Sequence, residues 1–157
     1  MVNISEDGSK IAMTQQHTIQ KLLSKYKLEN TTPTKSPFNP KVTLTEDNGD
    51  PIQDITQFRS LIGGLFWIAR TTQPDIMFTV SVLAQYQAAP TNVHMGAAIH
   101  VLQYLAGTIN KGIELTRKTT RALLAWTNSS HNDIQRGMFG TTGFVVTIGK
   151  SPITWSS

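Results

Sequence analysis

Close to Gly107 the hydrophobic periodicity of the chain changes from helical to alternating, and this change constrains the fold more than any other feature. Before it, apolar residues recur at the three- and four-residue spacing of helices, in stretches opened by Asp54, Pro74 and Pro90. After it, apolar residues alternate, as they do in strands. The expected strands are residues 113–117, 122–127, 139–148 and 152–155, with a tight turn at 149–150. Helices and strands separated in this way predict an α+β fold.

The N-terminal third predicts a hairpin, a helix and an irregular segment. Residues 1–13 alternate around Asp7-Gly8, which indicates a β-hairpin. Residues 15–26 carry apolar side chains on one helical face, with Thr14 as the expected N-cap. Residues 28–53 contain four prolines and no periodicity, which indicates a linker or an extended strap. The expected parts are therefore 1–27 (hairpin and helix), 28–53 (proline-rich linker), 54–107 (helices) and 108–157 (strands).

The helix that follows Asp54 carries the most specific local signals. Asp54 is expected to cap it, with Gln57 as the partner three residues later. Gly63 and Gly64 each weaken a helix by roughly 1 kcal/mol relative to alanine. Close approach of a neighbouring helix usually offsets that cost, so we expect one here. Trp67 lies on this apolar helix and is expected in the core.

Two further side-chain types raise the question of binding. His94 and His100 are six residues apart, which places them on different faces of a helix, so a shared metal site is not expected. His94 is instead expected to cap the helix start or to pack there. Trp126 and Trp155 lie on predicted strands, where core packing and base stacking are equally good interpretations.

The composition excludes several classes of protein. The chain has 157 residues, a formal charge of +4 and a pI of about 9.5, which permits nucleic-acid binding. It has no cysteine, which excludes disulfides and thiolate metal sites. No signal peptide is recognisable, and no apolar run reaches the ~18 residues that span a bilayer. We therefore expect an intracellular protein, in the cytoplasm or nucleus, that is not secreted and has no membrane partner.

Residues 58–76 read FRSLIGGLFWIARTTQPDI. This segment resembles the helical region after the polymerase palm of copia-type LTR-retrotransposon reverse transcriptases, with its pattern Y-R-S-L-I-G-x-L-x-Y-L ending in T-R-P-D-I. Residues 90–108 resemble the family pattern P-T-x-x-H-x-x-A-x-K-R-I-L-R-Y-L-K-G-T. Residues 143–157 resemble the first strands of the fused RNase H domain, G-Y-V and G-P-I-S-W-S-S. The resemblance implies the end of the palm in 1–27, thumb-like helices in 54–107 and a truncated RNase H-like sheet in 108–157.

Departures from the family pattern imply that this chain is not an enzyme. The metal-binding Asp that opens the family's RNase H domain falls at Asn128, whose amide lacks the charge that a two-metal site needs. Between Thr116 and Ser157 the sequence has one acidic residue, Asp133. The paired aspartates of the polymerase and the other RNase H acids are expected outside this chain. The intact family is an RNA-directed DNA polymerase with RNase H that uses Mg²⁺; here we expect no catalytic residue, metal site or cofactor.

The expected function is that of a catalytically incomplete fragment with weak, non-specific binding to RNA, DNA or an RNA–DNA hybrid. Lysine and arginine side chains would contact the phosphates. The candidates are Lys10, Lys21, Lys25, Arg59, Lys111, Lys118 and Arg121. Basic positions of the family pattern are occupied here by Gln73, Ile99, His100, Gln103, Ala106, Met138 and Phe139. Each lost cation is expected to remove a phosphate contact and so to weaken the grip.

A protein-interaction module is the alternative function. A truncated RNase H-like sheet would leave strand edges and one face uncovered, and such surfaces pair with other chains. The partner would be a second copy of this chain or an intact reverse transcriptase. Ionic strength distinguishes the two functions, because phosphate contacts weaken steeply with salt whereas apolar association persists.

Overall fold

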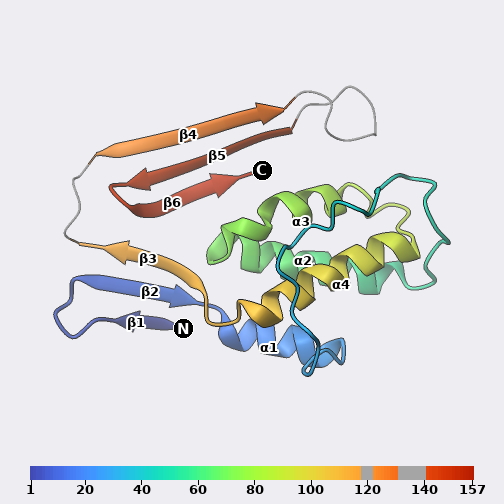
Figure 1. Ribbon diagram of the computed structural model, residues 1–157, viewed down its shortest axis with the longest axis horizontal. Helices are drawn as coiled ribbons and strands as arrows, with labels where there is room; N and C mark the ends of the chain where they lie inside the picture. Colours follow the sequence, from blue (N-terminus) through green and yellow to red (C-terminus); the bar gives the residue numbers. More distant parts are fainter. Residues whose placement is uncertain (118–121, 131–140) are drawn as a thin grey trace.

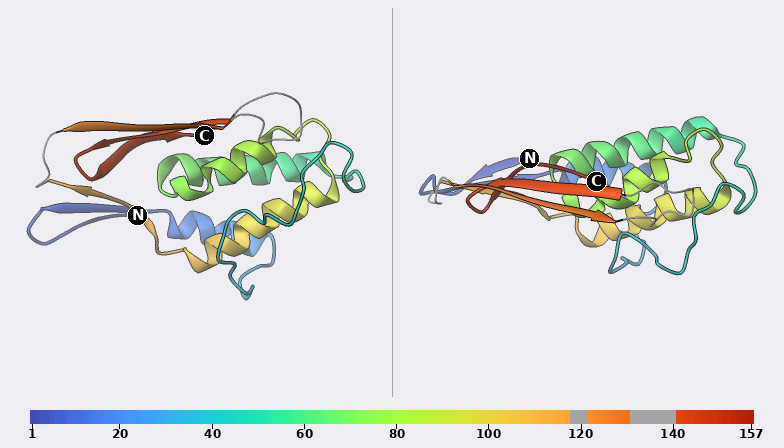
Figure 2. Two further views of the ribbon diagram at one scale, coloured as in Figure 1. Left: turned by 45° about the horizontal axis from the view of Figure 1, so that its top comes forward. Right: turned by 90° about the horizontal axis from the view of Figure 1, so that it is seen from above.

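Helices and strands occupy separate parts of the molecule in the computed structural model, which describes residues 1–117, 122–130 and 141–157. Four α-helices and one short 3-10 helix form one part, and two three-stranded antiparallel sheets project from one end of it (Figure 1 and Figure 2). This arrangement confirms the predicted α+β fold. No described helix combines the length and the apolarity needed to cross a membrane.

The helical part contains α1 (Gln16–Lys25), α2 (Ile55–Thr71), the 3-10 helix η1 (Pro74–Ile76), α3 (Met77–Ala84) and α4 (Asn92–Gly107). The expected caps of α2 and α4 are confirmed. Asp54 Oδ1 accepts a hydrogen bond from Gln57 N at 2.9 Å at the start of α2. Thr91 and His94 form a capping box at the start of α4, in which the Thr91 N–H donates to His94 Nδ1 at 3.0 Å. These contacts satisfy backbone donors that a helix start leaves without partners.

The first sheet joins the N-terminal hairpin to a strand from beyond the helices. β1 (Val2–Ile4) and β2 (Lys10–Thr14) form the predicted hairpin, with Gly8 at φ +63° in its turn. β3 (Gly112–Thr116) pairs antiparallel with β2. Because Thr14 ends β2, it is not the N-cap that the sequence predicted for α1, which begins after Gln15 without a side-chain cap. The chain segments before and after the helical part therefore meet in one sheet.

The second sheet consists of β4 (Leu123–Ser130), β5 (Thr141–Ile148) and β6 (Ser151–Ser156), antiparallel and in that order. The predicted turn before β6 is confirmed, with Gly149 at φ +59°. The first residues of the predicted strand 139–148 lie outside the described residues. β6 attaches this sheet to the helices, because Trp155 Nε1 donates to Ala69 O of α2 at 2.7 Å. Trp155 is thus a packing residue rather than an exposed stacking surface.

Residues 28–53 pack along the helices as an extended strap. Of the two interpretations of this segment, a linker or a strap, the strap is therefore correct. It runs past α4 in Figure 1. Leu44 is buried in the core, and Tyr86 Oη donates to its carbonyl at 2.8 Å. Nearer the start of the strap, the backbone carbonyl oxygen of Ser36 lies 3.0 Å from Nε2 of His100 in α4. The strap therefore belongs to the folded unit despite its lack of helices and strands.

The core lies between the helices, and α2 contributes the largest buried set. These residues are Phe58, Leu61, Ile62, Leu65, Ile68 and Ala69. α1 approaches α2 closely at Gly64, where a Cβ would lie 3.2 Å from Leu22 Cδ2. At Gly63, by contrast, a Cβ would have no neighbour within 4 Å. The expected close approach of a neighbouring helix is therefore confirmed for one of the two glycines.

Candidate nucleic-acid interface

Trp67 is the most exposed tryptophan of the chain, with 61% of its surface accessible, although it lies inside α2, in its C-terminal half. Its predicted place in the core is wrong. Ser60 lies seven residues before Trp67, Gly63 lies four residues before it, and Arg70 lies three residues after it. Side chains at these spacings share one face of a helix. All three of these residues are exposed as well. Their small or polar character was the sequence signal that Trp67 faces outwards.

α1 extends this exposed side of α2. Lys25 Nζ donates to Ser60 Oγ at 3.0 Å, and Tyr26 Oη donates to Gln57 O at 3.2 Å. Lys21 is one turn before Lys25 and is exposed on the same helix. The exposed side of the two helices is called the α1/α2 face below. It consists of Lys21, Lys25, Ser60, Gly63, Trp67 and Arg70.

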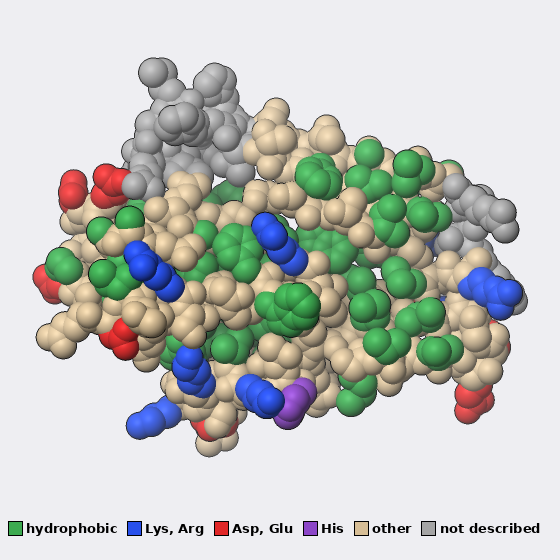
Figure 3. Space-filling model, turned by 180° about the vertical axis from the view of Figure 1, so that it is seen from behind, with side chains coloured by type: hydrophobic (Ala, Val, Ile, Leu, Met, Phe, Trp, Pro, Cys, Tyr) green, Lys and Arg blue, Asp and Glu red, His purple; other side chains and the backbone are tan. Residues whose placement is uncertain are grey.

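The α1/α2 face combines positive charge, an aromatic ring and open backbone. Lys21, Lys25 and Arg70 are exposed, and none of them takes part in a salt bridge within the described residues. The Arg70 guanidinium lies 5.4 Å from the centroid of the Phe66 ring, a contact that orients it along the face. A Cβ at Gly63 would meet no atom within 4 Å, so the surface of α2 is open at this position. Figure 3 shows the side of the molecule opposite to Figure 1, where lysine and arginine side chains surround apolar ones over the helical part.

The other cations that the sequence offered do not join this face. Lys10 forms a salt bridge at 3.0 Å across β2 and β3. Arg59 Nε donates to a backbone carbonyl of the α3–α4 connection at 2.9 Å, so its guanidinium has a structural partner. Lys111 is exposed just before β3. Lys118 and Arg121 lie outside the described residues. The structure thus brings together two predicted candidates, Lys21 and Lys25, and adds Arg70, which the sequence analysis missed.

Three uncharged residues at family basic positions, Gln73, His100 and Gln103, have structural partners. Gln73 has 1% of its surface accessible, and its Nε2 donates to Thr108 O at 2.9 Å. A side chain so deeply buried does not meet phosphate, and the expected loss of a phosphate contact relative to the family pattern stays a prediction. His100 contacts the strap, as described above, and Gln103 Nε2 donates to Thr31 Oγ1 of the strap at 3.2 Å. The strap therefore explains these two polar residues without reference to nucleic acid.

Asn128 lies in β4 and lines a groove of about 290 Å³ between the second sheet and the helices η1 and α3. The acidic side chain in this lining is Asp75, whose Oδ2 accepts a hydrogen bond from Tyr104 Oη at 2.5 Å. Burial, with this contact, raises the pKa of Tyr104 to about 12. The described residues contain no cluster of three His, Asp or Glu side chains that could hold a metal. Asp133, Met138 and Phe139 lie outside the described residues.

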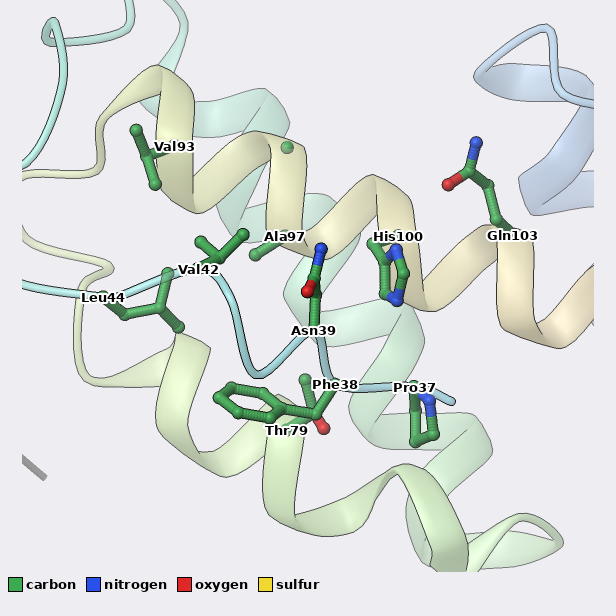
Figure 4. Close-up of a pocket in the computed structure, with 11 residues that line it drawn as sticks. Pro37, Phe38, Asn39, Val42, Leu44, Thr79, Val93, Ala97, His100 and Gln103 are labelled. Atoms are coloured by element: carbon green, nitrogen blue, oxygen red, sulfur yellow. The ribbon is translucent and has the colours of Figure 1, made fainter. Parts of the chain in front are cut away.

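A second hollow, of about 300 Å³, lies under the strap (Figure 4). Phe38, Val42 and Leu44 of the strap line it on one side, and Ala97 of α4 lines it on the other. Its lining contains no Lys, Arg, Asp or Glu. Because phosphate recognition requires cations or aligned donors, the α1/α2 face is the better candidate interface.

Comparison with known proteins finds relatives encoded by transposons. The chain is 33% identical, over 92% of its length, to the retrovirus-related Pol polyprotein from transposon RE1 of Arabidopsis thaliana, of which it covers 10%. It is 34% identical, over 87% of its length, to the corresponding RE2 polyprotein of the same plant, of which it covers 9%. It is 30% identical, over 99% of its length, to a putative transposon Ty5-1 protein of Saccharomyces cerevisiae, of which it covers 50%. No protein-family model and no solved structure matches the chain.

Proposed function

The chain belongs to the family of retrovirus-related Pol polyproteins of transposons, as a segment of them, and we propose that it is a catalytically incomplete segment that binds nucleic acid weakly and without sequence preference. Its ligands would be RNA, DNA or an RNA–DNA hybrid. The proposal places the chain inside the cell, in the cytoplasm or nucleus, where these ligands occur.

The α1/α2 face carries the proposal. Non-specific binders combine cations that meet the phosphates with aromatic rings that meet bases or sugars. Lys21, Lys25 and Arg70 supply the cations, and Trp67 supplies the ring between them. Gly63, four residues before Trp67, lets a backbone come close to the helix because it has no side chain.

The number of cations sets the expected strength. If three phosphates are neutralised, log K falls with log salt at a slope of about −2 to −3. A fourfold rise in salt should then weaken binding about 20- to 40-fold. Non-specific dissociation constants are typically in the range of about 10⁻⁴ to 10⁻⁶ M at physiological salt. A binder with three cations is expected near the weak end of this range.

Asn128 supports the catalytic half of the proposal. In-line phosphoryl chemistry with two divalent ions requires several carboxylates around them. The described residues of the second sheet, 122–130 and 141–157, contain no Asp or Glu, and Asn128 contributes a neutral amide. These residues therefore do not fit the Mg²⁺ ions that the family resemblance implies. We expect no cleavage of an RNA–DNA hybrid by this chain.

Fluorescence anisotropy with a labelled RNA–DNA hybrid and a labelled single-stranded RNA tests the binding. Trp67→Ala should weaken binding at low salt several-fold, because the ring contributes about 1–3 kcal/mol per stacked base. Trp126→Ala is the matched control, since Trp126 is 54% exposed but lies on the second sheet. Lys25→Ala should also weaken binding and reduce the salt slope by about 1, whereas Lys41→Ala, an exposed lysine of the strap, should not. If Trp67→Ala and Trp126→Ala weakened the affinity for nucleic acid equally, the assignment of the binding site to the α1/α2 face would be refuted.

A further inference from the structure

The hollow of about 300 Å³ under the strap has walls from parts of the chain that are far apart in sequence. Phe38, Val42 and Leu44 of the strap form one wall, and residues of α3 and α4 form the other (Figure 4). An edge-to-face contact holds the ring of Phe38 in place, with 6.1 Å between its centroid and that of Phe78 in α3. The described lining residues all lie within 37–103. The shape of the hollow therefore follows from the packing of the strap on these two helices.

Gly96 gives the hollow part of its space. It lies three residues after Val93 and four residues before His100 on α4, and all three residues line the hollow. These spacings place them on one face of the helix. A Cβ at Gly96 would meet no atom within 4 Å. Since an apolar cavity of about 150 Å³ holds one benzene molecule, the hollow has room for about two fused aromatic rings.

Two side chains bring hydrogen-bonding groups to the hollow. Because the carbonyl oxygen of Ser36 can only accept, His100 Nε2 carries the proton of the neutral imidazole, and His100 Nδ1 is an acceptor. Asn39 Oδ1 accepts from Lys41 N at 3.1 Å, which leaves Asn39 Nδ2 as a donor. Figure 4 shows Asn39 and His100 towards one end of the hollow and Leu44 towards the other. The hollow thus has an apolar end and a polar end with one donor and one acceptor.

We propose that the hollow binds an uncharged aromatic molecule of about two fused rings that carries one hydroxyl group. The rings would fill the apolar end, and the hydroxyl would donate to His100 Nδ1 and accept from Asn39 Nδ2. The ligand is uncharged because the described lining contains no Lys, Arg, Asp or Glu, and an ion without a counter-charge is strongly disfavoured in an apolar space. A few polar groups in a mostly apolar hollow of this volume are typical of small-molecule sites. None of the described lining residues belongs to the α1/α2 face, so this site is independent of nucleic-acid binding.

Calorimetric titration with β-naphthol, a neutral molecule with two fused rings and one hydroxyl, tests the chemistry of the ligand. We expect saturable one-to-one binding and a rise in Tm, because the ligand binds the folded state alone. The methyl ether of β-naphthol has no donor for His100 Nδ1 and should bind about 2- to 10-fold more weakly. β-Naphthoate has similar rings and a carboxylate, and should show no saturable binding.

Two substitutions test the place of binding. Gly96→Leu should fill the hollow and weaken β-naphthol binding at least about tenfold, while Tm stays the same or rises, since leucine is the better helix former. Gln20→Leu is the matched control, because it adds the same side chain at an exposed position of α1. Asn39→Asp keeps an oxygen for Lys41 N but removes the donor, and should weaken binding by at least about 2- to 10-fold.

Three results would each overturn the proposal. The first is the absence of saturable β-naphthol binding by the natural chain. The second is an equal affinity for β-naphthol and β-naphthoate, since the hollow offers no partner for a charge. The third is unchanged binding in a folded Gly96→Leu protein. If Gly96→Leu does not fold, unchanged binding in Asn39→Asp would overturn the proposal in its place.

Discussion

Replacement of Gly63 by alanine should separate stability from binding. Within a helix, glycine is about 1 kcal/mol less favourable than alanine. At Gly63 the new methyl group would meet no atom within 4 Å, so nothing offsets the gain in helix propensity. For a domain of this size, about 1 kcal/mol corresponds to a rise in Tm of about 2–4 °C. We expect Gly63→Ala to raise Tm by that amount.

The adjacent Gly64 is the matched control. A Cβ there would lie 3.2 and 3.3 Å from the two δ-methyl groups of Leu22, so the Leu22 side chain would have to move by a few tenths of an ångström. The same gain in propensity is then offset by strain against Leu22. Thermal unfolding followed by circular dichroism should give a clearly smaller rise for Gly64→Ala than for Gly63→Ala, or no rise at all.

Gly63→Ala should weaken nucleic-acid binding although it raises Tm. The added methyl group lies beside Trp67 on the α1/α2 face and keeps an approaching nucleic-acid backbone away from the helix. Anisotropy with the RNA–DNA hybrid at low salt should show a several-fold weaker affinity for the more stable protein. An affinity equal to that of the natural chain would refute close approach at Gly63, and a lower Tm would refute the reasoning about the open site.

Three further predictions concern single buried or titrating groups. Gln73→Leu removes two buried hydrogen bonds of the Gln73 amide, one to Thr108 O and one from Thr108 Oγ1, and should lower the free energy of unfolding by about 1–3 kcal/mol in urea titrations; an unchanged midpoint would contradict this. The pKa of Tyr104 is raised to about 12, so the folded state favours the neutral phenol; that contribution is complete below about pH 10 and is lost as pH rises towards 12. Stability measured across this window should fall less steeply in Tyr104→Phe than in the natural chain. Hydrogen bonds to the Asp7 carboxylate, of which those from Ser9 have the largest effect, lower the pKa of Asp7 to about 2. The contribution of the ionised Asp7 to the stability of the hairpin is therefore complete above about pH 4 and is lost only as pH falls towards 2. A carboxyl NMR titration of Asp7 with a midpoint near 4 would contradict this.

Local features of the sequence predicted local structure well. The cap at Asp54 and the capping role of His94 were predictable because each depends on side chains within three residues of the helix start. Trp67 was misplaced because α2 is broadly apolar, and hydrophobicity alone assigns its tryptophan to the core. The helical position of Trp67 relative to Gly63 and Arg70 contained the correct answer.

Long-range features could not be predicted in the same way. Nothing in the alternation of β3 states whether it pairs with the strands that follow it or with β2, near the start of the chain. The path of the strap depends on hydrogen bonds between side chains of α4 and backbone groups far away in sequence, as between His100 and Ser36. The burial of Gln73 has the same origin, because its partner, Thr108, is 35 residues away.

The pairing of β2 with β3 also has a consequence for the order of folding. Thr14 pairs with Gly112, so this contact closes a loop of about 100 residues at an entropic cost on the order of 4 kcal/mol. Contacts among the helices are more local, so we expect the helices to assemble before the loop closes. During synthesis the hairpin leaves the ribosome before the helices, and one edge of β2 stays unpaired until residues 112–116 follow. A nascent chain that stops before residue 112 would contain all of its helices. It would still lack β3, the strand that joins the two ends of the helical part.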